Sequence, residues 1–297
     1  SLGLTDSALR SAILLAILAF VVYPVLPRGF ADRWDLLDLR AAWIIVMLIA
    51  GIGFVNYILL KMYGPKGVAL TGFLGGIVNS TVTVTEMATR DRDSGDALTG
   101  VAYAGILLAI VASILRNAVL LVLLAPAALV SGMLAFTLMI GAGVVLLVLH
   151  YRSVRASEAT AQNQPLIPLT SPFSITSAIK YGLVFLDIQV TGILGQRLLG
   201  HAGFYFISII GGVLSSASTV ASAALLAAHG TITPSVAAIG AVLATAVSVL
   251  VNVVFATRVS KDPGLKKHLT LTMSSLAVLG ILGVIVQNAV ASLMTRP

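Results

Sequence analysis

The residues that could do chemistry gather in one otherwise apolar stretch, GFLGGIVNSTVTVTEMATR, residues 72–90. Adjacent glycines weaken a helix inside a bilayer, and the freed carbonyls and amides, together with hydroxyl groups, can then line a cavity. Carbonyl and hydroxyl oxygens suit alkali and alkaline-earth ions, whereas exposed helix termini suit a small anionic or zwitterionic solute. On one continuous helix these residues would share a face that carries Gly72, Gly76, Asn79, Thr83, Glu86 and Arg90.

Close packing is the alternative explanation for the glycines, because small residues spaced by four bring membrane helices together. Packing alone is satisfied by alanine, so it explains the density of hydroxyl groups less well. The sequence therefore supports two hypotheses for this stretch, a substrate pathway and a helix-packing face.

Ionisable and amide side chains inside apolar segments form a second group of candidates. Each is costly in a bilayer unless it is paired or lies in a cavity. Asp187 lies in the middle of its segment, and Arg116 or Lys180 is its candidate partner. The alternative for both basic residues, favoured for Lys180, is a side chain that extends toward the membrane interface. Asn117 follows Arg116 directly, inside the same apolar segment. Glu86 comes just before the sequence RDRD, which favours a solvated helix end over a membrane site.

Soluble-enzyme chemistry has little support in the sequence. The chain has no cysteine, and its four histidines lie at segment ends without metal-ligand spacing. The sequences GPKG and GGVLSS lack the full pattern of a phosphate-binding loop. We therefore expect no catalytic residue, no cofactor and no enzyme activity, and the sequence identifies no metal ligand.

Composition indicates which elements must position these residues. Apolar residues make up 58% of the 297-residue chain and charged residues 10%, and the mean hydropathy is +1.05, far from the values of a soluble domain. Lipid offers the backbone no hydrogen bonds, so the segments must be helical. The net charge of +7 falls in short connectors, where it suits lipid headgroups, and we expect no nucleic-acid partner. The sequence predicts an all-α, polytopic transmembrane bundle of about nine membrane segments, near 11–27, 41–60, 67–85, 101–124, 127–149, 177–199, 202–228, 230–257 and 269–295.

An internal repeat divides the chain. A shift of 136 residues aligns YGPKGVALTGFLGGIVNSTVTV with LGHAGFYFISIIGGVLSSASTV, and a shift of 135 aligns VAYAGILLAIVASILRN with VAAIGAVLATAVSVLVN, which matches Asn117 with Asn252. We predict an extra helix and connector (1–39), a first half (40–151), a polar linker (152–174) and a second half (175–297). The predicted pathway residues are Gly75, Gly76, Asn79, Ser80 and Thr83 in the first half and Gly211, Gly212, Ser215, Ser216 and Thr219 in the second.

The glycine-rich helix of each half is predicted to be broken or re-entrant. Its path decides the symmetry of the repeat. Four complete crossings in each half would make the halves parallel, whereas a re-entrant glycine segment would leave three crossings and make the halves inverted.

The stretch from LLDLRAAW to EMATR, residues 36–90, resembles the C-terminal membrane domain of unknown function found behind the MgtC/SapB-type module of bacterial and archaeal membrane proteins. The pattern of that family is Gly-Gly, two hydrophobic residues and Ser-Ser-Thr-Ala-Thr-Thr, and here it reads GGIVNSTVTV, residues 75–84. Asn79, Val82 and Val84 depart from the pattern. The resemblance covers most of residues 10–260. It implies a link to magnesium homeostasis and an MgtC-type module as a partner, and it brings no ligand residues with it.

We expect a transport or channel-like protein in the lipid bilayer of the prokaryotic inner membrane. Its first expected substrate is an inorganic cation, Mg²⁺ or a monovalent ion, although the scarcity of carboxylates weighs against Mg²⁺ bound without its water. One alternative is a secondary transporter of a small organic or anionic solute. The other is a regulatory or assembly subunit that transports nothing and uses its glycine faces to pack against partners or a second copy.

Overall fold

The structure is a computed structural model that describes residues 13, 16–27, 39–40, 43–44, 46–47, 67–94, 99–155 and 175–294. The described residues form helices and connecting turns, with no strand among them. Most of the predicted segment 41–60 and most of the linker 152–174 lie outside the described residues. A short π-helix, η1, and helix α2 are followed by six long helices. The bounds are η1 Leu18–Val22, α2 Tyr23–Val25, α4 Gly67–Ser94, α5 Thr99–Leu124, α6 Pro126–Arg155, α7 Ile175–Ala228, α8 Pro234–Val259 and α9 Pro263–Met294.

Proline and capping residues explain where three of these helices begin. α6, α8 and α9 each start with a proline, whose missing N–H is tolerated in the first turn of a helix. Thr233 caps α8 by accepting a hydrogen bond from the N–H of Val236 at 3.3 Å. Asp262 caps α9 by accepting from the N–H groups of Gly264 at 3.1 Å and Leu265 at 2.7 Å.

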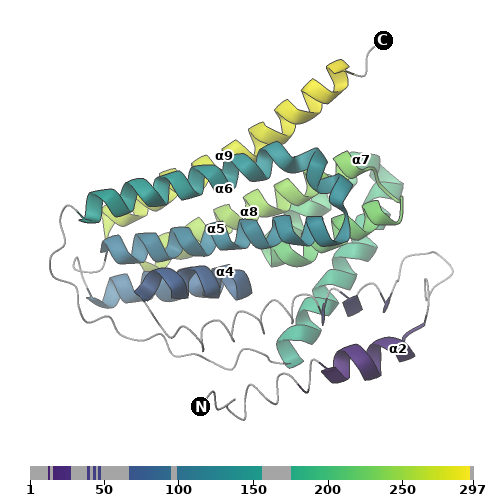
Figure 1. Ribbon diagram of the computed structural model, residues 1–297, viewed down its shortest axis with the longest axis horizontal. Coiled ribbons are helices and arrows are strands. Elements are labelled where there is room, and N and C mark those ends of the chain that lie inside the picture. Colours follow the sequence, from purple (N-terminus) through teal and green to yellow (C-terminus); the bar gives the residue numbers. More distant parts are fainter. Residues whose placement is uncertain are drawn as a thin grey trace.

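Helices α5, α6, α8 and α9 lie side by side as a bundle (Figure 1). At one end, which we call the Ser260 end, Ser260 donates a hydrogen bond to Asp91 at 2.7 Å, and His150 contacts the carbonyl of Gly100 at 2.8 Å. The opposite end, which we call the Ala125 end, holds the turn at Ala125 between α5 and α6 and the turn before α8. α5 and α9 therefore run from the Ser260 end to the Ala125 end, and α6 and α8 run the opposite way.

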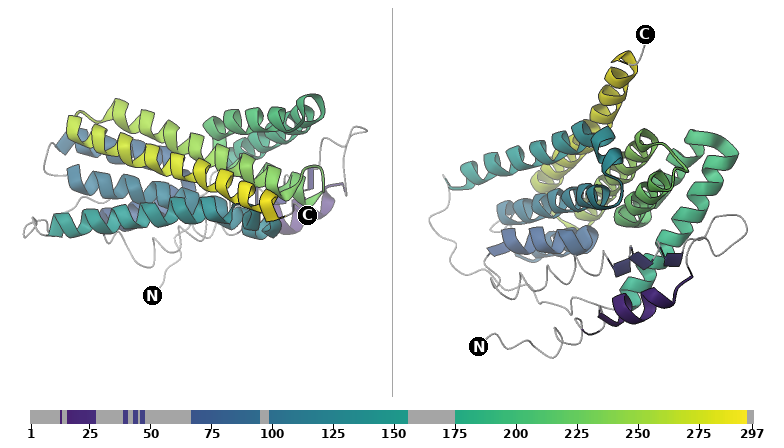
Figure 2. Two further views of the ribbon diagram at one scale, coloured as in Figure 1. Left: turned by 90° about the horizontal axis from the view of Figure 1, so that it is seen from above. Right: turned by 45° about the vertical axis from the view of Figure 1, so that its right-hand side comes forward.

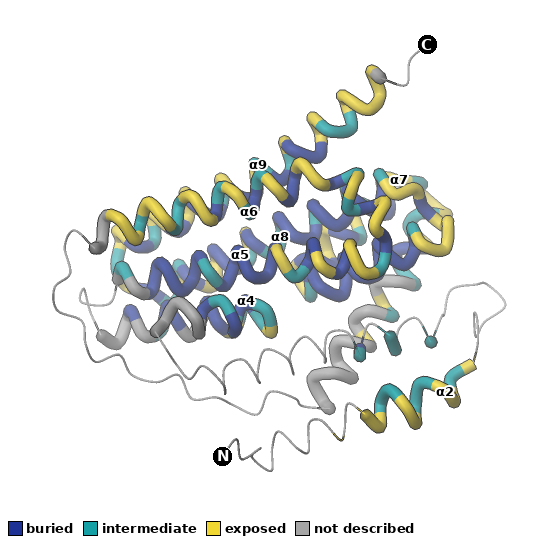
Figure 3. The backbone as a smooth tube through the Cα atoms, viewed as in Figure 1, coloured by how far each residue is buried: buried dark blue, intermediate teal, exposed yellow. Residues whose placement is uncertain are grey.

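The surface of the bundle is that of a membrane protein. Figure 3 shows α5 and α8 largely buried, while α6 and α9 carry many exposed residues. Large apolar side chains make up much of this exposed surface, among them Val130, Met133, Val145, Leu282 and Ile285. Five segments of the described chain are long and apolar enough to cross a bilayer: 102–124, 126–152, 190–228, 234–259 and 263–293. The chain is a multi-pass, all-helical membrane protein.

Helix α4 reverses direction at Asn79, whose φ of −152° and ψ of 99° are not helical. A Cβ built on Gly75 would lie 2.6 Å from Thr83 Oγ1, although eight residues of straight helix would separate these positions by about 12 Å. Gly72 packs against Gly105 and Gly76 against Ala109, so the first arm, residues 67–78, runs parallel to α5. The second arm, 80–94, returns to the start of α5. We call residues 67–94 the α4 hairpin; both its ends lie at the Ser260 end.

Helix α7 contains two reversals, at Gly200 (φ 62°, ψ −147°) and at Ser215 (φ −164°, ψ 103°). The positive φ at Gly200 suits glycine because it has no Cβ. Beyond it, a Cβ built on Gly240 would lie 2.8 Å from Ser208 Oγ, and Gly212 packs against Ala244. Residues 201–214 therefore run parallel to α8, and residues 216–228 return to its start. We call residues 201–228 the α7 hairpin, which opens at the Ala125 end.

Two of the nine predicted membrane segments do not cross the bundle, in line with the broken or re-entrant glycine-rich helices that the sequence predicts. Segments 67–85 and 202–228 fold back at mid-depth of the bundle, because each helix breaks at a polar residue and its second arm returns to the end where the first began. The predicted polar stripe along one face of residues 72–90 is wrong for the same reason, because residues before and after Asn79 belong to different arms. Figure 2 shows α4 and the later part of α7 in two further views of the bundle.

The hairpin topology makes a labelling prediction in this cysteine-free chain. His201 and His229 are exposed at the two ends of the α7 hairpin, and Lys261 is exposed at the opposite end of the bundle. We expect a membrane-impermeant maleimide to label His201→Cys and His229→Cys from the same side of sealed vesicles, and Lys261→Cys from the other side. Labelling of His201→Cys and His229→Cys from opposite sides would contradict the hairpin and restore a crossing helix.

Candidate functional site

Each hairpin tip is held by the side chain of the residue at which the helix breaks. Asn79 Oδ1 accepts a hydrogen bond from the N–H of Val82 at 3.2 Å, and Ser215 Oγ accepts from the N–H of Ser218 at 3.3 Å. Both residues thus act as N-caps of the second arm of their hairpin. They lie 136 residues apart, the same shift that aligns the two halves of the sequence.

The threonines of the predicted pathway support the same two tips. Thr83 Oγ1 donates to the carbonyl of Asn79 at 2.9 Å, and Thr219 Oγ1 donates to the carbonyl of Ser215 at 2.8 Å. Each bond runs from a threonine to the carbonyl four residues before it, which at an N-cap also accepts the first N–H bond of the returning arm. Both hydroxyl protons are therefore used in holding the backbone.

The glycines of the two motifs provide close packing. Gly76 lies against the backbone of Ala109, and Gly212 lies against the backbone of Ala244, so neither position has room for a side chain. Gly75 brings the two arms of the α4 hairpin together at Thr83, and Gly211 is buried in the α7 hairpin. Close approach to α5 and α8 places both tips near the middle of these helices.

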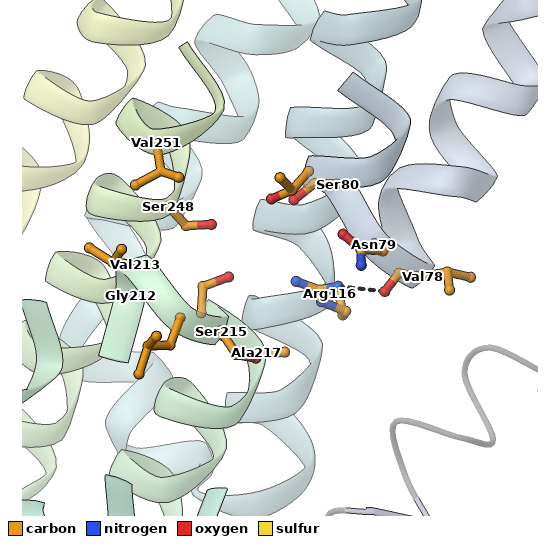
Figure 4. A pocket seen from close by; sticks show the side chains of 13 residues that line it. Val78, Asn79, Ser80, Arg116, Gly212, Val213, Ser215, Ala217, Ser248 and Val251 are labelled. Carbon is orange, nitrogen blue, oxygen red and sulfur yellow. Dashed lines mark hydrogen bonds between the residues drawn. The ribbon is translucent and has the colours of Figure 1, made fainter. Parts of the chain in front are cut away.

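A pocket of about 80 Å³ lies between the two tips (Figure 4). A cavity of this size has room for water or a small ligand. Its lining comes from four helices: α4, α5, α7 and α8. The described lining residues are Val78, Asn79, Ser80, Thr81, Arg116, Gly212, Val213, Leu214, Ser215, Ser216, Ala217, Ser248 and Val251.

Among the described residues that line the pocket, Arg116 alone carries a charge. Its Nη1 donates to the carbonyl of Ile77 at 2.9 Å and to that of Val78 at 3.4 Å, and Figure 4 shows the guanidinium beside Val78 and Asn79. These carbonyls end the first arm of the α4 hairpin, where the helix dipole is negative. Arg116 therefore stabilises the break and brings a positive charge to the pocket.

Two helix N-termini also face this pocket. Ser80 and Thr81 begin the second arm of the α4 hairpin, and Ser216 and Ala217 begin the second arm of the α7 hairpin. The first N–H groups of a helix have no partner within that helix, and they carry the positive end of its dipole. The pocket thus combines two positive helix ends and one guanidinium with the carbonyl ends of the two first arms.

Two asparagines lie fully buried beside the tips, at matching positions of α5 and α8. Asn117 Nδ2 donates to Thr245 Oγ1 at 3.0 Å, and Asn252 Nδ2 donates to Ser80 Oγ at 3.3 Å. Both side chains are 0% exposed. The Oδ1 atoms of both have no hydrogen-bond partner in the described part of the chain.

The other predicted sites lie elsewhere. Asp187 is exposed on the first part of α7, and among the described side chains it forms no pair with Arg116, which donates to backbone carbonyls. The side chains of Lys180 and Glu86 lie outside the described residues. No group of three histidine, aspartate or glutamate side chains that could hold a metal ion occurs in the described ranges.

Sequence reasoning missed several pocket residues. Ser248 and Val251 on α8 line the pocket, but neither belongs to the glycine-rich motif. Ser248 aligns with Ser113 and Val251 with Arg116 under the shift of 135 residues. The repeat alignment therefore contained the signal that α5 and α8 contribute to one site.

The packing of the glycines predicts a stability difference within the chain. Gly76→Ala and Gly212→Ala should each destabilise the protein by about 1–3 kcal/mol or more, because the added Cβ meets backbone that cannot rotate away. Gly141→Ala on α6 is the matched control: its Cβ would meet nothing within 4 Å, and we expect unchanged or slightly higher stability. Thermal unfolding in detergent measures the stability of all three variants. Equal melting temperatures would contradict the close packing of Gly76 and Gly212 against α5 and α8.

Comparison with known proteins gives one family and no closer relative. No curated protein and no solved structure matches the chain. A family described as a domain of unknown function, DUF4010, matches residues 47–260. This range includes both hairpins and every residue that lines the pocket. The chain belongs to the DUF4010 family.

Proposed function

We propose that this protein is a membrane transport protein whose substrate is a small anion, bound between the two hairpin tips. The observation that carries the proposal is the convergence of two helix N-termini and Arg116 on one pocket. Backbone N–H groups at helix N-termini are anion sites, and a guanidinium strengthens them with charge-assisted hydrogen bonds.

The depth of the pocket supports a substrate site. A charge and two positive helix ends lie near the middle of helices long enough to span a bilayer. Charged groups at such depth are expensive and mark substrate or ion pathways. A guanidinium attracts an anion and repels a cation, which supports an anionic over a cationic substrate.

Opposed hairpins support transport rather than static binding. Both ends of the α4 hairpin lie at the Ser260 end of the bundle, and both ends of the α7 hairpin lie at the Ala125 end. Each hairpin therefore lies between the pocket and a different side of the membrane. Transporters built from inverted repeats place broken helices around a midplane site in this way and expose it alternately to the two sides. We propose that the two halves are such an inverted repeat. Its support is the antiparallel course of α5 and α8, and of α6 and α9, together with the matching breaks at Asn79 and Ser215.

The cation first expected from the sequence has less support as the transported substrate. The described residues of the pocket include no carboxylate, and Mg²⁺ prefers carboxylate ligands. Five expectations from the sequence stay predictions: the link to magnesium homeostasis, the MgtC-type partner, the homodimer, the location in the prokaryotic inner membrane and the absence of enzyme activity.

The alternative function, a regulatory or assembly subunit, requires glycines that pack against a partner protein. The contacts of Gly72, Gly76 and Gly212 are made within this chain, to α5 and α8. These glycines therefore have an internal packing role, which leaves the polar pocket to be explained by a ligand.

Substitution of Arg116 tests the charge. In liposomes containing the purified protein, we expect uptake of at least one of chloride, phosphate, sulfate or succinate. Arg116→Gln should weaken the apparent affinity for that anion roughly 10- to 100-fold, because a charged hydrogen bond contributes about 1.5–3 kcal/mol. Arg116→Lys keeps the charge and should retain part of the affinity. Uptake of none of these anions by folded wild-type protein would overturn the proposal.

Two substitutions of Ser80 distinguish anion binding by its backbone N–H group from anion binding by its hydroxyl group. Asn79 is extended, so it tolerates a following proline, and proline is accepted at the first position of a helix. Ser80→Pro removes the N–H that faces the anion, whereas Ser80→Ala removes only the hydroxyl. We expect anion affinity to fall further in Ser80→Pro than in Ser80→Ala. Equal affinities in the two folded variants would contradict recognition by the helix N-terminus.

A further inference from the structure

The two hairpin tips differ in what faces their carbonyl ends. In the α4 tip, Arg116 donates to the last carbonyls of the first arm. The residue that matches Arg116 on α8 is Val251, which lines the pocket together with Val213 and Leu214 at the end of the first arm of the α7 hairpin. Valine cannot donate a hydrogen bond, so the α7 tip has no counterpart of the guanidinium among the described lining residues.

A second observation is the buried amide of Asn117, whose oxygen, like that of Asn252, has no hydrogen-bond partner in the described part of the chain. Its NH₂ group donates to Thr245 Oγ1, and the hydroxyl proton of Thr245 goes to the carbonyl of Ala241 at 2.7 Å. Thr245 can therefore only accept from the amide, which identifies the oxygen as the end without a partner. An unsatisfied buried acceptor is costly, and a cation or a donor would remove that cost.

Asn117 lies next to the α7 tip. Thr245 adjoins Ala244, whose backbone packs against Gly212, three residues before the break at Ser215. In the other half, the matching Asn252 contacts Ser80, the first residue after its break. Applied to the α7 half, the repeat alignment predicts that Asn117 lies toward Ser216 and the carbonyl end of residues 201–214.

We propose that the α7 tip binds an alkali-metal cation at the position that the Arg116 guanidinium occupies in the α4 tip. Its ligands are the Asn117 Oδ1 atom, the hydroxyls of Ser216 and Ser248, and carbonyl oxygens at the end of the first arm. All of these are neutral oxygens, which suit a monovalent ion, whereas divalent ions prefer carboxylates. Half-helix C-terminal ends supply carbonyls to Na⁺ in broken-helix transporters.

A cation at this tip would add positive charge beside the pocket. If the proposed anion site is correct, the two ligands raise each other's affinity by the same factor, because binding linkage is reciprocal. This consequence rests on the proposed function. The cation site itself does not, since it is argued from Asn117, Val251 and the carbonyl end alone.

Cation binding can be measured directly on the purified full chain. We would follow thermal unfolding in detergent at constant chloride and ionic strength, with Na⁺, K⁺ or Li⁺ replacing N-methylglucamine, and radioactive ²²Na⁺ binding by scintillation proximity. We expect one alkali ion to raise the melting temperature with saturation. Equal melting temperatures in all four chloride salts would overturn the cation site while leaving the anion proposal, which is tested by varying the anion, untouched.

Two substitutions and a control locate the site. Asn117→Leu keeps the side-chain volume but removes the oxygen, and it should weaken cation affinity about tenfold or more. Val251→Arg supplies a tethered guanidinium, as Arg116 does in the other half, and should make stability independent of the cation. Ser113→Ala is the control, because this buried hydroxyl on the same helix bonds the carbonyl of Ile110 at 2.9 Å and should leave affinity unchanged. Wild-type cation affinity in folded Asn117→Leu or Val251→Arg would overturn the proposal.

Discussion

The rest of the structure depends on a constraint on the backbone: a helix that breaks inside a bilayer must satisfy its freed N–H and carbonyl groups within the protein. Asn79 and Ser215 meet this requirement on the N–H side by capping the returning arms. Thr83 and Thr219 bond the carbonyls of those same residues. The capping side chains at both breaks follow from this requirement, and the pocket lies between the tips because both breaks occur at the same depth.

Close packing and polar chemistry act together in the two motifs. Without a Cβ at Gly76 and Gly212, the first arms lie against the backbones of α5 and α8. That close approach positions the breaks beside Arg116, Asn117 and the matching residues of α8. Packing and pathway were opposed hypotheses for the glycine-rich stretch. In the structure the glycines do the packing, and the residues that follow them line the pocket.

Much of the architecture was predictable from sequence, and the path of the chain was not. Apolar runs and prolines marked α5, α6, α8 and α9, because these helices cross with few polar interruptions. Residues 67–85 and 202–228 are also long enough to cross, so length alone could not distinguish a crossing from a hairpin. The breaks fall at Asn79 and Ser215, three residues after the glycine pairs, because a break needs a capping side chain more than it needs flexibility.

The asymmetry between the halves is the feature with the most bearing on mechanism. The two tips break at aligned residues, yet one carries its positive charge covalently on Arg116 and the other has Val251 at the aligned position. A covalently attached charge stays with its tip in every state of the protein. A bound cation, as we propose for the α7 tip, can leave. The charge of the pocket would then depend on whether the α7 tip has bound a cation from the side of the membrane to which it was last exposed. The two halves would therefore have different roles.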